Sequence, residues 1–174
     1  MDMSLGMDMD DDPIYKMLLS KLTKRERMEG KQPLAFKVET GKGGQLPTRG
    51  HVGDAGFDLY VSERTVVLPG EFVDVPCGVS CELPDGHWGL IIGRSSTLRN
   101  RGLMVTQGVI DHGYRGELFA GVWNLRGQES VIQAGDRVAQ FIVLPLIADQ
   151  LVPVQVAELS EHSRGTSGFG STGA

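Results

Sequence analysis

The sequence predicts a single domain of the all-β class. After residue 30 the apolar residues come in short runs bounded by Gly and Pro, and no helical periodicity longer than a turn or two appears. The 24 Gly and 8 Pro among 174 residues imply many turns, as short strands require. A hydrophobic content of 40% is enough for a moderate core with some tail.

Residues 1–30 differ in composition from the rest of the chain. Residues 1–12 are acidic, rich in Met and without periodicity, so we expect them to be disordered. Between Pro13 and Glu29, apolar residues recur at helical spacing before a charged run, which predicts a short amphipathic helix. A single short helix is marginal in water, so an extension without a partner is an equal alternative.

Strands and turns fill the chain from residue 33. The expected strands are apolar and bounded by turn residues; they lie at 33–39, 56–62, 65–84 with a turn at Pro69-Gly70, and 87–93, with three more between 122 and 159 around a turn at 134–136. A Gly-rich loop at 41–56 matches no core-forming pattern. Residues 95–103 could form a brief helical turn at most.

The stretch GVIDHGYRGE, Gly108–Glu117, is predicted to form a β-hairpin. Its first arm is β-branched, His112-Gly113 supplies a tight turn in which glycine is free to take positive φ, and an extended pattern follows. Asp111 and Tyr114 flank the turn, so a carboxylate and an aromatic ring would face the same space. In isolation such an Asp would simply bond its own backbone.

This stretch resembles the third motif of the trimeric dUTP nucleotidohydrolases (dUTPases), and four other stretches resemble the family's remaining motifs in order. They are AGFDLY (55–60), GRSSTLRNRG (93–102), GDRVAQFIV (135–143) and RGTSGFGSTG (164–173). The resemblance covers about residues 33–174. It implies a jelly-roll-like β-barrel at 31–158, a flexible Gly/Ser-rich C-terminal lid at 159–174, and the N-terminal extension described above. It also implies a homotrimer with active sites at subunit interfaces.

The activity implied by the resemblance is hydrolysis of dUTP to dUMP and pyrophosphate, which limits uracil in DNA and supplies dUMP for dTMP synthesis. In-line attack of water on the α-phosphate needs a placed water, a proton acceptor and positive groups. The family's motif places the catalytic Asp at Asp111. Asp58 and Asp136 are expected to orient waters or fix turns, with a purely structural role equally open. Asp54 and Glu117 are competing acids.

The resemblance also assigns the substrate contacts. In the family the hairpin's backbone pairs with uracil, and Tyr114 resembles the ring under deoxyribose, where a 2′-hydroxyl would not fit. Gln107 stands near a position where some members carry an Asn, which makes it a candidate base contact. The remaining expected contacts are to the phosphates, the sugar and the base: Arg94, Ser95, Ser96, Gly108, Ile110, Gln140, Arg164 to the γ-phosphate, Phe169 stacked on uracil, Gly170, Ser171 and Thr172.

The triphosphate implies Mg²⁺ more than the protein does. The four His residues are scattered, and no His and Cys cluster has metal-ligand spacing. Because Mg²⁺ prefers phosphate oxygens and waters, we expect it to bind through the substrate, with carboxylates touching it through water at most. Cys77 and Cys81 are too few for a disulfide framework and fit better as small buried hydrophobes.

Charge and hydropathy limit the other partners. A net charge of −5 argues against a general nucleic-acid binder, which needs a basic surface. No run of about 18 apolar residues exists, and no signal peptide is recognisable, so we expect a cytoplasmic protein without membrane contact.

Two rival functions are open. The dCTP deaminases share the fold and carry similar Arg-Ser-Ser and Ile-Asp-x-Gly-aromatic elements, but the Glu that acts as their base falls on Gly121 here, and the Gly-rich tail indicates the hydrolase. The second rival is a regulatory protein that binds another macromolecule through the dUTPase scaffold. Residues 1–30 would be the natural site for such a protein partner.

Overall fold

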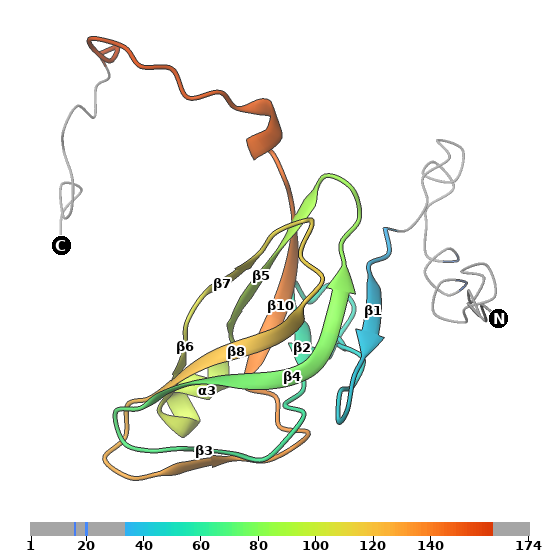
Figure 1. Cartoon of the computed structure of the whole chain (residues 1–174), viewed down its shortest axis with the longest axis vertical. Helices are drawn as coiled ribbons and strands as arrows, with labels where there is room; N and C mark the ends of the chain where they lie inside the picture. Colours follow the sequence, from blue (N-terminus) through green and yellow to red (C-terminus); the bar gives the residue numbers. More distant parts are fainter. Residues whose placement is uncertain (1–15, 17–19, 21–33, 162–174) are drawn as a thin grey trace.

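The computed structural model describes Lys16, Ser20 and residues 34–161, and its ordered body is built almost entirely of β-strands (Figure 1). The elements in chain order are β1 (Lys37–Thr40), β2 (Phe57–Leu59), β3 (Thr65–Val67), β4 (Phe72–Glu82), β5 (His87–Gly93), α3 (Ser95–Arg101), β6 (Leu103–Val105), β7 (Gly108–Ile110), β8 (Glu117–Asn124), β9 (Ser130–Ile132), β10 (Ala139–Pro145) and the 3₁₀ turn η2 (Ala148–Gln150). The predicted all-β class is confirmed. Within these residues no helix is long and apolar enough to cross a membrane.

The strands form two four-stranded antiparallel sheets and a two-stranded ribbon. The first sheet has the order β1-β4-β8-β6, the second has the order β2-β10-β5-β7, and β3 pairs with β9 in the ribbon. The two large sheets are hydrogen-bonded separately, as layers of a jelly-roll-like body, and β7 is the last strand at one edge of the second sheet. An edge strand leaves a row of backbone N–H and C=O groups unpaired.

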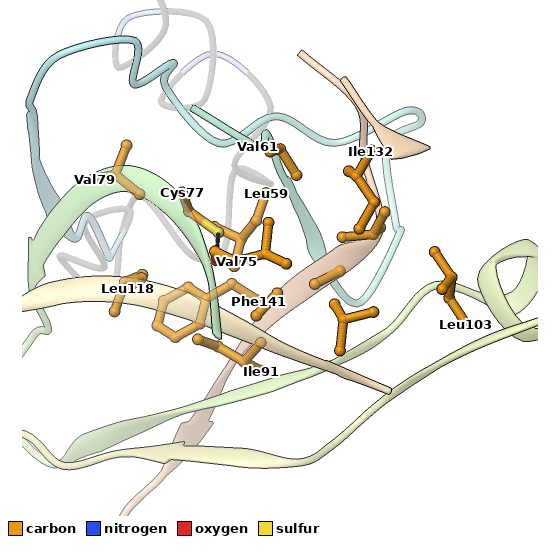
Figure 2. Close-up of a cluster of buried hydrophobic side chains, with 14 of the residues drawn as sticks. Leu59, Val61, Val75, Cys77, Val79, Ile91, Leu103, Leu118, Ile132 and Phe141 are labelled. Atoms are coloured by element: carbon orange, nitrogen blue, oxygen red, sulfur yellow. Dashed lines mark hydrogen bonds between the residues drawn. The ribbon is translucent and has the colours of Figure 1, made fainter. Parts of the chain in front are cut away.

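The hydrophobic core lies between the two large sheets. Figure 2 shows Val75 and Leu118 from the first sheet and Ile91 and Phe141 from the second pointing into this interior, and all four side chains are at most 1% exposed. Burying a side chain of this size contributes about 1.5 to 3 kcal/mol. A Cβ on Gly89 would collide with the Phe141 ring, so glycine is required beneath that ring.

Strand β8 illustrates why the sequence forms a half-buried sheet. Apart from the buried Gly121, its buried positions from Leu118 to Asn124 alternate with exposed ones, because successive side chains of a strand point to opposite faces. Phe119 and Trp123 lie on the outer face, 42% exposed each, although both are aromatic. This outer face therefore carries apolar surface that none of the residues described by the structure covers.

The two cysteines are buried in β4, as predicted, and both are free thiols. Burial, with a smaller contribution from the nearby Glu117 carboxylate, raises the pKa of the Cys77 thiol to about 12. A thiol in this state is a small core residue without nucleophilic reactivity near neutral pH.

The predicted β-hairpin at Gly108–Glu117 is wrong, although its turn exists. Strand β7 pairs with β5, whereas β8 pairs with β4 and β6, so the segment connects the two sheets. The Tyr114 N–H donates to the Asp111 carbonyl at 3.0 Å, which closes the turn without a positive φ at Gly113. The local residue pattern identifies the turn. Which strand β7 or β8 pairs with depends instead on which sheet can bury its side chains.

Helix α3 has seven residues, more than the single turn expected, and β6 was not predicted. The helix ends at Gly102, which takes a left-handed conformation at φ 63° and donates its N–H to the Leu98 carbonyl at 2.9 Å. The buried Thr97 hydroxyl donates to the Val138 carbonyl at 2.7 Å. The Thr97 contact joins the helix to a residue distant in sequence, so a pattern confined to these seven residues could not reveal it.

The predictions for the two ends of the chain lie mostly outside the described residues. Lys16 and Ser20, inside the predicted N-terminal helix, have helical backbone. The acidic start at 1–12 and the tail motif at 164–173 are not described. The division into extension, barrel and lid therefore stays a prediction.

Candidate active site

The structure forms an open pocket of about 400 Å³ from three predicted motifs and the loop that precedes β2. We call it the arginine pocket. It is lined by residues of the 50–56 loop together with Asp58, Arg94, Ser95, Arg137 and Gln140. Three segments that are distant in sequence thus meet at one place, because β2 and β5 both pair with β10.

Asp58 holds the two arginines of the pocket. Its carboxylate oxygens lie 2.6 Å from Arg94 Nε and 3.1 Å from Arg137 Nη1, and the residue is 9% exposed. A buried carboxylate requires such partners, and the two ion pairs fix both guanidinium planes. Each guanidinium carries five N–H donors, so donors are left for an anion in the pocket.

Gln140 is also held in place. Its amide Nε2 donates to the Gly93 carbonyl at 3.1 Å, which directs the side chain from β10 toward the end of β5. A Cβ on Gly56 would collide with the Gln140 side chain, so glycine is required opposite it. The amide is thereby presented to the pocket in one orientation.

A second hollow of about 310 Å³ lies on the other side of Arg94 and Arg137 and includes Ser96. Its acid is Asp136, whose carboxylate accepts from Arg101 Nη1 at 2.9 Å and from the Gln133 N–H at 3.0 Å. Asp136 therefore fixes the turn before β10, where Gly135 has a φ of 86°. Ser95 and Ser96 consequently face two different hollows beside the same pair of arginines.

The turn at residues 111–114, which we call the Asp111 turn, is built differently. Asp111 is exposed, and its carboxylate makes no ion pair or hydrogen bond with any residue that the structure describes. Tyr114 is 41% exposed and donates its hydroxyl to the Glu117 carbonyl at 2.9 Å. Arg115 Nη1 donates to the carbonyls of His112 and Tyr114, both at 2.9 Å, which stiffens the turn.

Gly108, Ile110 and Gln107 belong to the approach to this turn. The first two lie on edge strand β7 and are partly buried, and Gln107 is exposed just before it. Within the part of the chain that the structure describes, the backbone of this strand pairs on one side only, with β5. Its other side is open to a ligand or a partner.

The arginine pocket and the Asp111 turn lie far apart within one chain. Ile110 pairs with Gly89 near the start of β5, whereas Arg94 follows the end of that strand. The five residues from Gly89 to Arg94, at about 3.3 Å each, span about 17 Å, and Asp111 lies one residue further out. The structure thus brings Asp58, Arg94, Ser95 and Gln140 together and places Ile110, Asp111 and Tyr114 toward the other end of β5, while Gly108 pairs with Ile91 between the two.

Arg137 is a pocket residue that sequence reasoning missed, as is His51, and Asp54 was named only as a rival acid. The signal for Arg137 was available, since it stands inside the GDRVAQ motif between Asp136 and Gln140. Asp54 accepts the His51 N–H at 2.7 Å and shapes the loop of the pocket. Arg164, Phe169, Gly170, Ser171 and Thr172 lie outside the described residues.

Comparison with known proteins decides the family. The dUTPase family model matches residues 42–173. A deoxyuridine 5′-triphosphate nucleotidohydrolase of Leifsonia xyli is 42% identical over 132 residues, which cover 74% of this chain and 86% of that protein. The chain belongs to the dUTPase family. A nucleotidohydrolase of the same name from Paramecium bursaria Chlorella virus 1 is also 42% identical and covers 73% of this chain and 89% of that one.

Solved dUTPases share the fold. The dUTPase of Staphylococcus bacteriophage 80alpha with dUpNHpp has a TM-score of 0.73 and 27% identity to this chain, covering 80% of it and 99% of the phage chain. The sheets described above are therefore those of a dUTPase.

The acids of the arginine pocket are suited to contact a metal ion through water and not as direct ligands. Among residues 34–161 no group of three or more His, Cys, Asp or Glu side chains could hold a metal ion. Both oxygens of Asp58 are already engaged by arginines, and Asp54 is engaged by the backbone of its own loop. This donor set fits an ion that is carried by phosphate oxygens and meets the protein through water.

Proposed function

We propose that this dUTPase hydrolyses dUTP to dUMP and pyrophosphate in a site shared between copies of the chain. The arginine pocket of one copy would hold the phosphates, and the Asp111 turn of another would supply the base-binding edge and the catalytic carboxylate. The observation that carries this proposal is the separation of about 17 Å along β5 between Gly89 and Arg94. A single nucleotide held by one chain could not reach both elements with its reacting phosphorus.

Asp111 is our candidate for the group that orients and deprotonates the attacking water. A proton acceptor must be free to meet water, and this carboxylate has no partner among the described residues. The other acids are occupied: Asp58 by two arginines, Asp136 by Arg101 and Glu117 by a backbone N–H. Occupied carboxylates are suited to fixing geometry and not to accepting a proton.

The phosphates would be bound by Arg94, Arg137, Ser95 and Gln140. Positive charge and N–H donors that are already fixed in place stabilise the charge that develops on the leaving pyrophosphate without reorganising during the reaction. The ion pairs with Asp58 supply that preorganisation for both guanidinium groups. Ser96 would contact the phosphate chain from the second hollow.

The open edge of β7 is suited to reading the pyrimidine. Gly108 and Ile110 lie on the last strand of the second sheet, where backbone donors and acceptors alternate without a partner. Uracil presents a complementary pattern, whereas the amino group of cytosine would meet a donor, at a cost of about 1 to 3 kcal/mol. Tyr114 would lie under deoxyribose, and Gln107 is the remaining side-chain candidate for the base.

Two exposed apolar surfaces support assembly as a homotrimer. The outer face of β4 and β8 exposes Phe72, Phe119 and Trp123, each more than 40% exposed. After β10 the chain leaves the sheets (Figure 1), and its segment 147–159 exposes a run of large aliphatic side chains, among them Leu151 and Val154 at 68% and 76%. Contiguous apolar surface of this kind in a soluble protein marks a protein interface.

Mg²⁺ is proposed as the cofactor, bound through the substrate. When bound to the phosphates it would neutralise part of their charge. Asp54 and Asp58 are the acids of the arginine pocket that could meet it through water. Arg164, Phe169, Gly170, Ser171 and Thr172 are proposed to close over the nucleotide, with Arg164 on the γ-phosphate and Phe169 on uracil.

The deaminase alternative is not favoured by the packing around Gly121. This is the position where the resemblance to dCTP deaminases would require a glutamate. A Cβ there would come within 2.9 Å of the Phe72 ring and would also collide with the Thr106 hydroxyl. A glutamate there would therefore require the Phe72 ring and the Thr106 side chain to shift. The regulatory alternative rests on residues 1–30, which the structure describes only at Lys16 and Ser20.

The decisive experiment is incubation of the full chain with dUTP, dCTP, dTTP and UTP in Mg²⁺, with measurement of monophosphate, pyrophosphate and ammonia. We expect dUMP and pyrophosphate from dUTP alone at an appreciable rate. Equal cleavage of all four nucleotides would contradict the proposed specificity, and ammonia from dCTP would instead establish the deaminase.

A further inference from the structure

The ring of Tyr114 is hydrogen-bonded through its hydroxyl to the first residue of β8. Its hydroxyl donates to the Glu117 carbonyl at 2.9 Å, three residues further along the chain. A Cβ on Gly116 would collide with that hydroxyl, so a side chain at this position would displace the ring. The orientation of Tyr114 therefore depends on where the backbone of Glu117 is held.

The Glu117 side chain ties this backbone to the neighbouring strand. Its Oε1 atom accepts the Gly78 N–H at 2.8 Å, across the pair formed by β4 and β8. Gly78 lies at the bulge of β4, where the register shifts between Pro76 and Ser80, and has a φ of 64°. A bulge removes an N–H from the strand ladder, and the Glu117 carboxylate satisfies it.

The bulge itself is a rigid support. The Gly78 carbonyl accepts the Gly41 N–H at 2.8 Å, so Gly78 is held through both its N–H and its carbonyl. A Cβ on Gly78 would come within 2.7 Å of the Gly44 backbone, which shows how closely the two segments approach. The Glu117 side chain thus adds a second tie to β4, beside the backbone pairing of Glu117 with Ser80, at the residue whose carbonyl holds the Tyr114 hydroxyl.

We propose that Glu117 is a positioning residue that sets the discrimination between dUTP and UTP. The inference rests on the proposed function, in which the Tyr114 ring lies under the sugar. The distance between the Tyr114 ring and the sugar determines whether a 2′-hydroxyl fits. The hydrogen bond from the Tyr114 hydroxyl to the Glu117 carbonyl sets the position of the ring. Glu117 acts through Tyr114 and not on the reacting atoms, since its carboxylate is engaged by the bulge.

The test compares Glu117→Ala with Glu117→Gln by the ratio of kcat/KM for dUTP to kcat/KM for UTP. The alanine variant leaves the Gly78 N–H unpaired, and we expect its ratio to fall about tenfold, the factor that corresponds to 1.4 kcal/mol and to the cost of one unsatisfied buried donor. The glutamine variant keeps an oxygen acceptor and should keep the ratio. Glu63→Ala is the matched control, because Glu63 lines the same hollow beside Gly78 but lies in the connection between β2 and β3.

A wild-type ratio in a folded Glu117→Ala protein would overturn the proposal, as would a glutamine variant that is as impaired as alanine. If the alanine variant does not fold, Tyr114→Phe decides, because it removes only the hydroxyl that reaches Glu117. An unchanged ratio in Tyr114→Phe would refute the inference, and a lowered ratio would support it. A wild-type protein that leaves dUTP intact would refute the proposed function instead.

Discussion

The arginine pocket and the Asp111 turn represent two ways of building half of a site. In the pocket, charged side chains hold one another: Asp58 pairs with Arg94 and Arg137, and Gln140 is bonded to the end of β5. In the turn, Asp111 is exposed and unpaired within the described residues, and the order comes from backbone contacts of Tyr114 and Arg115. The charged groups of the pocket are thus paired within one chain, whereas in the proposed site the turn acts on a nucleotide held by another copy.

The largest effect should come from substitution of Asp111 in the Asp111 turn. We expect Asp111→Asn to lower kcat for dUTP about 10³-fold, because the amide keeps the shape but cannot accept a proton. Binding of a non-hydrolysable dUTP analogue, measured by calorimetry, should be retained. Turnover near that of the wild type would exclude Asp111 as the proton acceptor.

Co-expression tests whether the two halves come from different copies. Asp111→Asn and the double variant Arg94→Gln, Arg137→Gln should each be inactive alone. Random mixing in a trimer should restore about a quarter of the sites, since each of the two contributing copies is unaltered at its half with a probability of one in two. No recovery in mixed trimers, with mixing verified by two affinity tags, would mean that one chain supplies both halves.

Removal of residues 164–174 should have the next largest effect. We expect a folded protein whose kcat/KM falls about 100-fold, because the γ-phosphate would lose a guanidinium contact and the base its stacking partner. Steady-state kinetics together with gel filtration would separate this loss from a loss of assembly. Full activity in the truncated protein would remove the lid from the mechanism.

A smaller effect is expected from substitution of Arg137 in the arginine pocket. Arg137→Gln removes one of two guanidinium groups that share Asp58, and we expect KM for dUTP to rise about tenfold, as for one lost charge-assisted hydrogen bond. Arg99→Gln, on the exposed side of α3, is the matched control and should change nothing. A fall in kcat at constant KM would place Arg137 in the chemical step instead.

Deletion of residues 1–30 should have the smallest effect. The strands and both halves of the site begin after residue 36, so we expect hydrolysis to continue at the wild-type rate. A pull-down with and without this segment would test its proposed role in binding a partner. A large fall in kcat after the deletion would connect the extension to the catalytic site.

Much of the site could be predicted because its motifs are local. The turn at Asp111, the Gly70 turn and the strand at 87–93 follow from short patterns of β-branched residues and glycines. The pairing of β7 with β5 could not be predicted in this way. This pairing places Asp111 and Arg94 beside opposite ends of β5. A local residue pattern contains no information on strand partners that are distant in sequence.

The sequence by itself determined the all-β class, the positions of the turns and the residue types that can bind a triphosphate, because each of these depends on spacing over a few residues. The tertiary structure decided which of them meet. It joined Asp58 to Arg94 and Arg137, engaged Glu117 at the bulge of β4 and left the Asp111 carboxylate without a partner among the described residues. The physical reason is that charge pairing and bulge geometry arise only when strands from distant parts of the chain pack side by side.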